Sequence, residues 1–233
     1  MKCVWEHNGS DTLLYSVDYI GAYTRGRTLY EALAKMQSEL EAYSIWLGKP
    51  IQQDTNVHIN QEKDSSLQIA DADSDVLFEA EKAPLTIEEY EKLKQLALKS
   101  ANDFYDLYFD IPNKDESCLS FRKTFYGNVP RTAQEMYEHT KNVNAYYFGE
   151  IGIETDNDGN IFDCRRRGFM LLEQKPDFLD NKVIEGSYGE LWTLRKVLRR
   201  FIWHDRIHAK AMYRMAIKTF GDLSVKNVFQ FKI

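Results

Sequence analysis

The chain has 233 residues, which is enough for one large domain or two small ones with a hydrophobic core. Hydrophobic residues make up 43% of it, so the composition excludes general disorder. The net charge of −6 disfavours nucleic acid as a partner. No apolar run approaches the roughly 18 residues of a membrane span, so we expect no membrane partner.

The three cysteines and the first residues both bear on the cellular compartment. Cys3, Cys118 and Cys164 are an odd number and lack the spacing of a redox or metal motif. The opening stretch, MKCVWEHNGSD, has no apolar core of a secretory signal. Because thiols stay reduced in the cytoplasm, we expect reduced cysteines in a cytoplasmic protein.

Charge is divided unevenly along the chain. Residues 1–83 contain 7 basic and 14 acidic residues, a net of −7, and residues 84–233 contain 23 and 22, a net of +1. Pro84 interrupts the pattern at the same point. The shift predicts two domains, 1–83 and 84–233.

The first part predicts a small sheet with one helix, in the order strand, strand, helix, strand, strand. TLLYSVDY (12–19) alternates as a half-buried strand does, whereas GAYTRGRT indicates a turn and a helix start. NVHIN (56–60) and DVLFEAE (75–81) are the later strand candidates. Residues 28–48 predict the helix, because their apolar positions form one stripe: Leu29, Leu33, Met36, Leu40, Tyr43 and Leu47.

The second part predicts a four-helix bundle, so that the whole chain is α+β. Thr86 with Glu89 and Thr132 with Glu135 are capping boxes, each of which begins a long helix. Residues 165–181 are expected to be helical in part. The last helix is predicted over about 188–220, with Gly221 as its end, and residues 223–233 as a strand or a packed tail.

The last helix contains two histidines four residues apart, in FIWHDRIHAKAM. His204 follows Phe201 by three and precedes His208 by four, so both rings are expected on the buried stripe and one turn apart. That spacing is the one used by helical zinc motifs. The remainder of the stripe is Leu191, Leu194, Leu198, Phe201, Met212 and Met215. The basic residues off this stripe are expected to be solvated: Arg195, Arg199, Arg206 and Lys210.

A third histidine lies on the inner face of the helix after Pro130. His139 stands three after Met136 and four before Val143, both on the apolar stripe. Buried imidazoles need partners for both nitrogens, and a shared ion would supply one. The pattern alone leaves two interpretations open, a metal site or core histidines bonded to their neighbours. His7 and His58 lack such company and are interpreted as surface or strand residues.

Residues 84–233 resemble the DinB-like superfamily and its YfiT-type metal proteins. WHDRIHAKAM is similar to the signature of the family's fourth helix, and the resemblance implies metal ligation by His139, His204 and His208. Some members are thiol transferases that use low-molecular-weight thiols, and others have lost the ligands. The resemblance therefore implies a divalent metal and a possible thiol cosubstrate. Imidazole ligands suit Zn, Ni or Fe and do not choose among them.

Residues 1–83 resemble the HicB-like fold, a small sheet with one helix. The resemblance rests on GAYTRGRTLYEALAKMQSELEAYSIWLG, with its turn, Thr-Leu helix start and trailing Trp-Leu. It implies a small binding or partner-facing domain. The net charge of −7 disfavours direct DNA contact by this part.

Two further stretches and two acidic residues resemble parts of functional sites. ETDNDGNIFDCR (154–165) is similar to a calcium loop, but Arg165 stands where a bidentate acid is needed, so a polar turn is expected. RRRG (165–168) is interpreted as a solvated charge run. Asp205 and Glu138 adjoin ligands in the sequence and point to other faces of their helices, where either could orient another histidine.

These observations predict a metal-dependent enzyme that transfers a thiol to a small-molecule substrate or hydrolyses it. The alternative is a non-enzymatic binding or stress-associated interaction protein whose metal is structural or absent. A homodimer is expected, because many bundles of this kind pair through helix faces.

Overall fold

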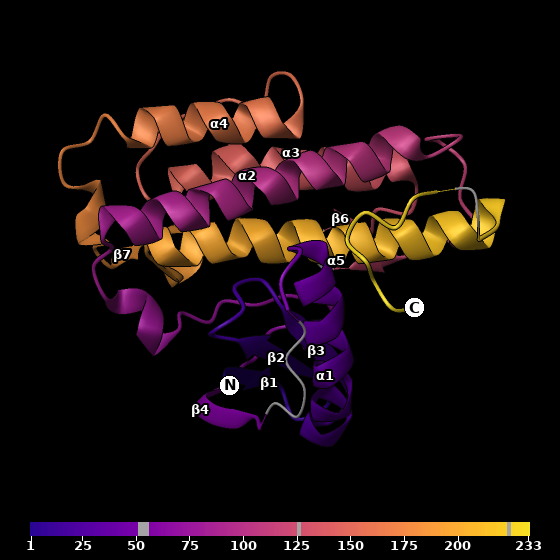
Figure 1. The fold of residues 1–233 in the computed structure, drawn as a ribbon, viewed down its shortest axis with the longest axis horizontal. Helices are drawn as coiled ribbons and strands as arrows, with labels where there is room; N and C mark the ends of the chain where they lie inside the picture. Colours follow the sequence, from indigo (N-terminus) through magenta and orange to yellow (C-terminus); the bar gives the residue numbers. More distant parts are fainter. Residues whose placement is uncertain (51–55, 125–126, 223–224) are drawn as a thin grey trace.

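The computed structural model describes residues 1–50, 56–124, 127–222 and 225–233. Its architecture is α+β, with a small N-terminal sheet followed by a helical C-terminal region (Figure 1). The predicted fold class is confirmed at that level. The two predicted domain bounds stay a prediction, because the two parts share hydrophobic clusters.

The sheet has four strands in the order β3-β2-β1-β4. They are β1 (Lys2–His7), β2 (Thr12–Ser16), β3 (Tyr23–Gly26) and β4 (His58–Asp64). β1 pairs antiparallel with β2 and parallel with β4, and β2 pairs antiparallel with β3. Helix α1 (Leu29–Trp46) contacts β2 and β3 and covers one face of the sheet. Its N-cap is Thr28, whose side chain accepts a hydrogen bond from the Glu31 N–H.

Two predictions for the first part were wrong in detail. GAYTRGRT was expected to be a turn and a helix start; the helix does begin after Thr28, but β3 lies where the turn was expected. This short polar strand shows no apolar alternation and depends on its pairing with β2. DVLFEAE (75–81) was expected to be a strand, but residues 75–78 are irregular and the 3-10 helix η2 (Glu79–Lys82) follows. Val76 and Phe78 are buried there against the sheet without joining it.

Four long helices form the second part, and the two expected capping boxes are both present, at Thr86 and at Thr132. The helices are α2 (Ile87–Asp110), α3 (Ala133–Gly149), α4 (Ile161–Leu172) and α5 (Leu194–Phe220). The connections between them contain the short strands β5 (Lys123–Thr124), β6 (Gly127–Asn128), β7 (Ile184–Glu185) and β8 (Leu191–Trp192) and the 3-10 helices η3 (Phe178–Asp180) and η4 (Ser187–Gly189). A further 3-10 helix, η1 (Ile69–Asp71), follows β4 in the first part.

The last helix ends at Gly221 as predicted but begins later than residue 188. Thr193 is its N-cap and accepts a hydrogen bond from the Lys196 N–H, so residues 187–192 are left to η4 and β8. Leu191, expected on the buried stripe, is therefore exposed. The described end of the chain, 225–233, contains no strand and packs as a tail through buried Phe229 and Phe231.

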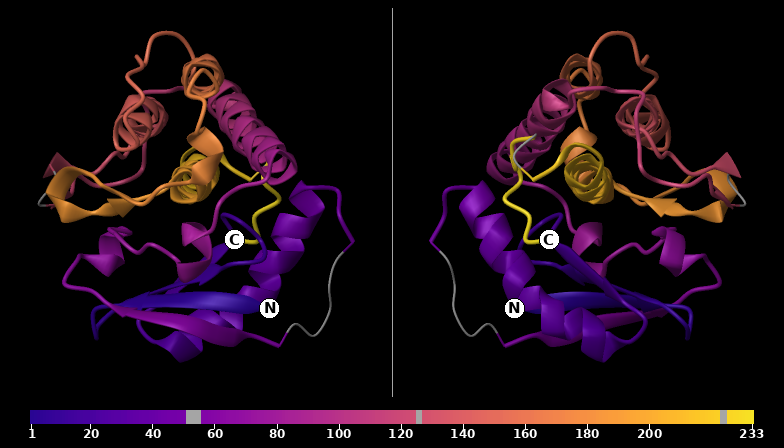
Figure 2. Two further views of the ribbon diagram at one scale, coloured as in Figure 1. Left: turned by 90° about the vertical axis from the view of Figure 1, so that its left-hand side faces the viewer. Right: turned by 90° about the vertical axis from the view of Figure 1, so that its right-hand side faces the viewer.

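Helix α5 is the central element of the molecule. In Figure 2 it is seen end-on between the sheet and the other helices of the second part. Trp203 and Ile207 on one side of α5 pack with Leu13, Tyr15 and Tyr23 of the sheet. Its other side packs against α2 and α3. A helix enclosed on several sides buries polar as well as apolar positions, which single-stripe reasoning does not anticipate.

The expectation of solvated basic residues on α5 was wrong for two of the four. The side chain of Arg199 forms an ion pair with buried Glu81, and Arg206 forms one with buried Glu39, at 2.5 Å. Both arginine side chains are buried because the acidic N-terminal part supplies their partners. Arg195 is only partly buried and donates to the carbonyl of Ala83.

Candidate metal centre

The three histidines singled out in the sequence lie together. His204 and His208 occupy successive turns of α5, and His139 faces them from α3. Ring centroids are 4.4 Å apart for His204–His208, 4.6 Å for His139–His208 and 5.2 Å for His139–His204. One nitrogen of each ring lies within 4.8 Å of one nitrogen of each other ring. The group could therefore hold a metal ion.

The three rings differ in their access to solvent. His204 is buried, with 7% of its surface exposed, His208 is half-buried, and His139 is exposed. The cluster is thus closed at the turn that carries His204 and open at α3. A site with one open side leaves room for a water molecule or a substrate atom beside the three protein ligands.

The surroundings keep all three imidazoles neutral near pH 7. The His139 ring loses water on the side that faces the cluster, although the residue is exposed on its other side, and this desolvation lowers its pKa. Burial together with the neighbouring His139 lowers the pKa of His208 to about 3. Burial lowers the pKa of His204 well below its usual range, and the other two histidines, Arg200 and Arg165 add to this effect. Neutral imidazole is the form that coordinates metals, so the lone pairs are available without loss of a proton.

Aromatic side chains hold the buried end of the cluster in place. Tyr147 of α3 meets the His204 ring edge-on at a centroid distance of 6.0 Å. Trp203 lies on the other side of His204 and is buried against the sheet. The Nδ1 atom of His204 is buried and has no hydrogen-bond partner among the described residues. Buried polar atoms rarely lack a partner, so this ring is the one whose environment most needs an additional bound group.

The geometry is compatible with a divalent ion. Zinc–imidazole bonds measure about 2.0–2.1 Å, so that coordinating nitrogens around a tetrahedral ion are about 3.4 Å apart. The candidate ligand nitrogens, one from each of the three rings, all lie within 4.8 Å of one another, which is a wider limit than this spacing. The donor set of three nitrogens and no carboxylate suits a transition metal rather than calcium or magnesium.

The acidic neighbours of the ligands have other partners. Asp205, adjacent to His204, forms a fully buried ion pair with Arg165 of α4 and does not contact a histidine ring. Glu138 forms an ion pair with Lys141 at 2.9 Å. The interpretation of RRRG as a solvated run was wrong for its first member, because Arg165 is buried. Its position near the apolar side of α4, between Ile161 and Phe169, is the signal that could have shown this.

The remaining candidate residues lie away from the cluster. His7 pairs with Glu62 at 3.0 Å and stacks on Trp5, and His58 is exposed in β4. None of the three cysteines forms a disulfide; Cys3 and Cys164 are buried and Cys118 is exposed. Beside the loop 154–165, Arg167 donates to Asp156 and to the carbonyl of Asp158, two residues of that loop.

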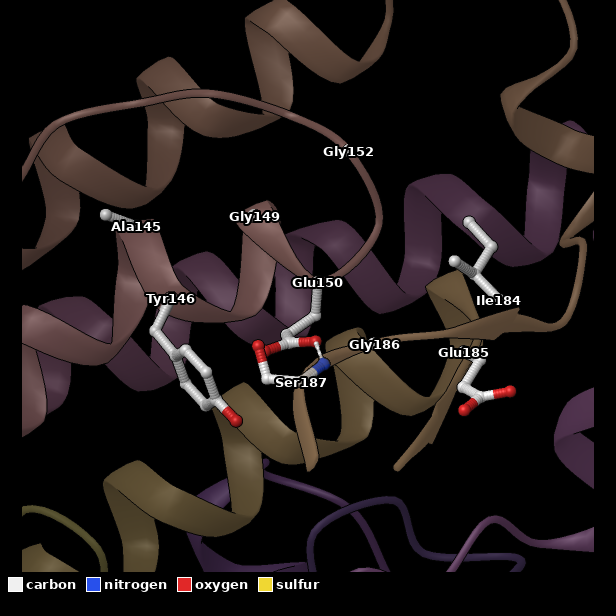
Figure 3. A pocket seen from close by; sticks show the side chains of 9 residues that line it. All are labelled: Ala145, Tyr146, Gly149, Glu150, Gly152, Ile184, Glu185, Gly186 and Ser187. Atoms are coloured by element: carbon white, nitrogen blue, oxygen red, sulfur yellow. Dashed lines mark hydrogen bonds between the residues drawn. The ribbon is translucent and has the colours of Figure 1, made fainter. Parts of the chain in front are cut away.

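A hollow of about 440 Å³ lies beside the C-terminal end of α3 (Figure 3). It is bounded by α3 and by the segment that contains β7, and Glu150 within it accepts a hydrogen bond from the Ser187 N–H at 2.7 Å. Its lining residues are Ala145, Tyr146, Gly149, Glu150, Gly152, Ile184, Glu185, Gly186 and Ser187. No histidine is among them, so this hollow is separate from the metal centre.

Fold and site together define a mixed α+β protein with a three-histidine group able to hold a metal ion. Comparisons with protein-family models, with curated proteins and with solved structures found no significant match. In the part of the chain that the structure describes, no helix has both the length and the apolar character needed to cross a bilayer.

Proposed function

We propose that the protein is a divalent-metal-dependent enzyme of DinB-like type that acts on a small molecule at His139, His204 and His208. The observation that carries the proposal is the convergence of three neutral imidazoles from two helices at a site open on one side. A purely structural zinc site is closed by four protein ligands, and here the histidines form a group of three among the described residues.

A bound Zn, Ni or Fe ion would supply Lewis acidity, which activates water or a thiol at neutral pH. The chain's own contribution is to present the imidazoles without protons and to hold them from two packed helices. His204 and His208 have a fixed spacing of one helical turn, and His139 completes the set from α3. Tyr147 packs against the ring of His204 and restricts its rotation. The open side next to His139 is where a thiol cosubstrate and an electrophilic small molecule would enter.

The rival function is a binding or stress-associated interaction protein with a structural or vestigial metal. One observation favours it: neither the hollow beside α3 nor a second hollow beside the start of α1 is lined by His139, His204 or His208. Enzyme substrates usually occupy formed pockets. Homodimer formation and a cytoplasmic location remain predictions from the sequence.

Cobalt titration of the purified, metal-free protein tests the proposal. Visible absorption bands of Co²⁺ report coordination number, and we expect one equivalent to bind in a site with an exchangeable water ligand. Each of the single variants His139→Ala, His204→Ala and His208→Ala should abolish the bands, whereas the matched control His58→Ala, an exposed histidine of β4, should leave them unchanged. If the Co²⁺ bands persist in all three variants, the metal centre is refuted.

Addition of a low-molecular-weight thiol to the cobalt-loaded protein separates the two functions. A thiol that reaches the open position adds a sulfur-to-cobalt charge-transfer band, and turnover of electrophilic small molecules should then depend on metal and thiol together. A cobalt spectrum that is unaffected by thiols and by small anions would indicate a closed site and favour the interaction protein.

A further inference from the structure

Arg165 is the most extensively bonded buried side chain of the helical region. Its guanidinium donates to both carboxylate oxygens of Asp205, one of them at 2.9 Å. It also donates to Asn144 Oδ1 at 3.0 Å and to the Ala97 carbonyl at 3.0 Å. The side chain has no exposed surface and lies over the Phe201 ring at 4.3 Å.

These four hydrogen bonds join all four long helices. Arg165 itself is on α4, Ala97 is on α2, Asn144 is on α3 and Asp205 is on α5. Two of the helices it bridges are those that carry the histidines. Asn144 follows His139 by five residues, and Asp205 directly follows His204. The bonds from Arg165 therefore tie α3 and α5 together close to the cluster.

We propose that Arg165 is a positioning residue for the three-histidine site, fixing α3 at the distance from α5 at which the His139 ring meets those of His204 and His208. This inference rests on the proposed function in one respect only, which is the expected effect of Arg165 on the affinity for metal. The rigid, planar guanidinium can bond a carboxylate with two nitrogens and still reach an amide and a carbonyl, which the single ammonium of lysine cannot do with the same geometry.

The test compares two buried ion pairs of the same design. Arg165→Met with Asp205→Asn removes the bridge. The matched control is Arg199→Met with Glu81→Gln, because Arg199 also bonds both oxygens of a carboxylate, donates to one backbone carbonyl and lies over a phenylalanine ring, at 3.9 Å. The side-chain hydrogen bonds of Arg199 join α5 to the N-terminal part, and among the described residues none of them goes to α3. Asn144→Ala is a milder variant that keeps the test valid if the first does not fold. It removes the bond from Arg165 to α3 and, within α3 itself, the bond from Asn144 to the Lys141 carbonyl.

The primary readout uses the metal-free protein with labelled histidines. Nuclear Overhauser cross-peaks between His139 and the two rings of α5 report the gap between helices, and the His204–His208 cross-peak reports one helix alone. In the Arg165 variants we expect the cross-peaks of His139 to weaken and the His204–His208 cross-peak to persist. In the Arg199 control both should persist. Unchanged His139 cross-peaks in the Arg165 and Asn144 variants would overturn the inference.

Zinc titration provides the second readout. The Kd for Zn²⁺ should rise about 10–100-fold in the Arg165 variant, as is common when support of ligands is lost, and far less in the control at equal loss of thermal stability. An equal rise in both variants would mean that the effect is general destabilisation and would overturn the inference. If the unmutated protein binds none of zinc, nickel and iron while the cross-peak result holds, the proposed function fails and the positioning role stands.

Discussion

At the residue scale, the histidines link protonation to folding. A buried neutral imidazole is protonated more readily in the unfolded chain than in the folded protein, so acid favours unfolding. Burial lowers the pKa of His208 from 6.5 to about 3 in the folded protein and lowers that of His204 in the same direction. The folded state therefore binds fewer protons than the unfolded state at pH values below 6.5 and above about 3.

This difference predicts the sign of a pH effect. In the metal-free protein, the contribution of His208 to the free energy of unfolding should be constant above pH 6.5. The protein should lose stability progressively as the pH falls from 6.5 toward 3. His208→Gln removes that proton uptake, so its stability should fall less between pH 7.5 and 5.5 than that of the unmutated protein. Urea midpoints of both proteins at the two pH values measure the difference. Equal losses would show that His208 titrates normally in the folded state.

At the scale of elements, helix α4 approaches α3 closely because of one glycine. A Cβ atom at Gly168 would lie 2.1 Å from the Phe148 ring, and both residues are buried. The ring of Phe148 in turn packs on Phe169 and Phe201. The absence of a side chain at Gly168 is thus what lets the helix of Arg165 lie next to the helix of His139.

Gly168→Ala should force the two helices apart and destabilise the protein by about 1–3 kcal/mol, as overpacking of a core does. The control is Gly149→Ala at the end of α3, where an added Cβ meets no atom within 4 Å. That change should be neutral or stabilise by up to about 1 kcal/mol, since alanine favours helix over glycine. Urea unfolding measures both, and a Gly168 variant as stable as its control would contradict the close packing.

The elements that could be predicted from sequence are those governed by local chemistry. The capping boxes at Thr86 and Thr132 place two helix starts, and Gly221 places a helix end. The three site histidines were found because their stripe positions follow from helical period. Whether they bind metal is still a prediction. Local signals also fail in identifiable ways: β3 depends on its pairing with β2, and α5 begins only at Leu194 because residues 187–192 form other contacts.

The partners of the buried arginines could not be predicted, because they lie far away in the chain. Arg199 meets Glu81 and Arg165 meets Asp205, pairs separated by 118 and 40 positions in the chain. The position of Arg165 on the apolar side of α4 indicates burial but not its partner, and for Arg199 a helical wheel gives no sign that another element will cover it. The same limit applies to Asn144, whose role is visible only once α3 and α4 are packed.

At the scale of the whole molecule, the acidic N-terminal part neutralises basic residues of the central helix. Glu39 on α1 forms ion pairs with Arg206 at 2.5 Å and with Lys210 at 3.7 Å. The aromatic rings of Tyr43 and Trp46 lie against the Arg206 guanidinium, each at 4.9 Å. The excess of acidic residues in the first part of the sequence is therefore explained in part by ion pairs with basic residues of the second part.

Removal of one member of this pair should be costly. Glu39→Ala leaves Arg206 buried without its carboxylate, and we expect a loss of about 3–5 kcal/mol. The control on the same helix is Glu41→Ala, whose partner Lys232 is half exposed; solvent screens this pair, so we expect a much smaller loss. The free energy of unfolding, obtained from urea titration at pH 7, compares them. Similar small losses for both variants would show that the Arg206 pair is solvated in solution.

The joint packing also predicts how the separated parts behave. A chain of residues 84–233 alone would expose Trp203 and Ile207 and would leave Arg199 and Arg206 without acidic partners. Exposed apolar surface and unpaired buried charge both oppose folding, so we expect this fragment to lack a cooperative thermal transition and to associate or aggregate. Added in trans, residues 1–83 should restore the transition, since they supply both the apolar face and the carboxylates. Near-ultraviolet circular dichroism with size-exclusion chromatography measures each state. A monomeric fragment that melts cooperatively within a few degrees of the full chain would mean that the second part folds as an independent domain and that the buried pairs contribute little to it.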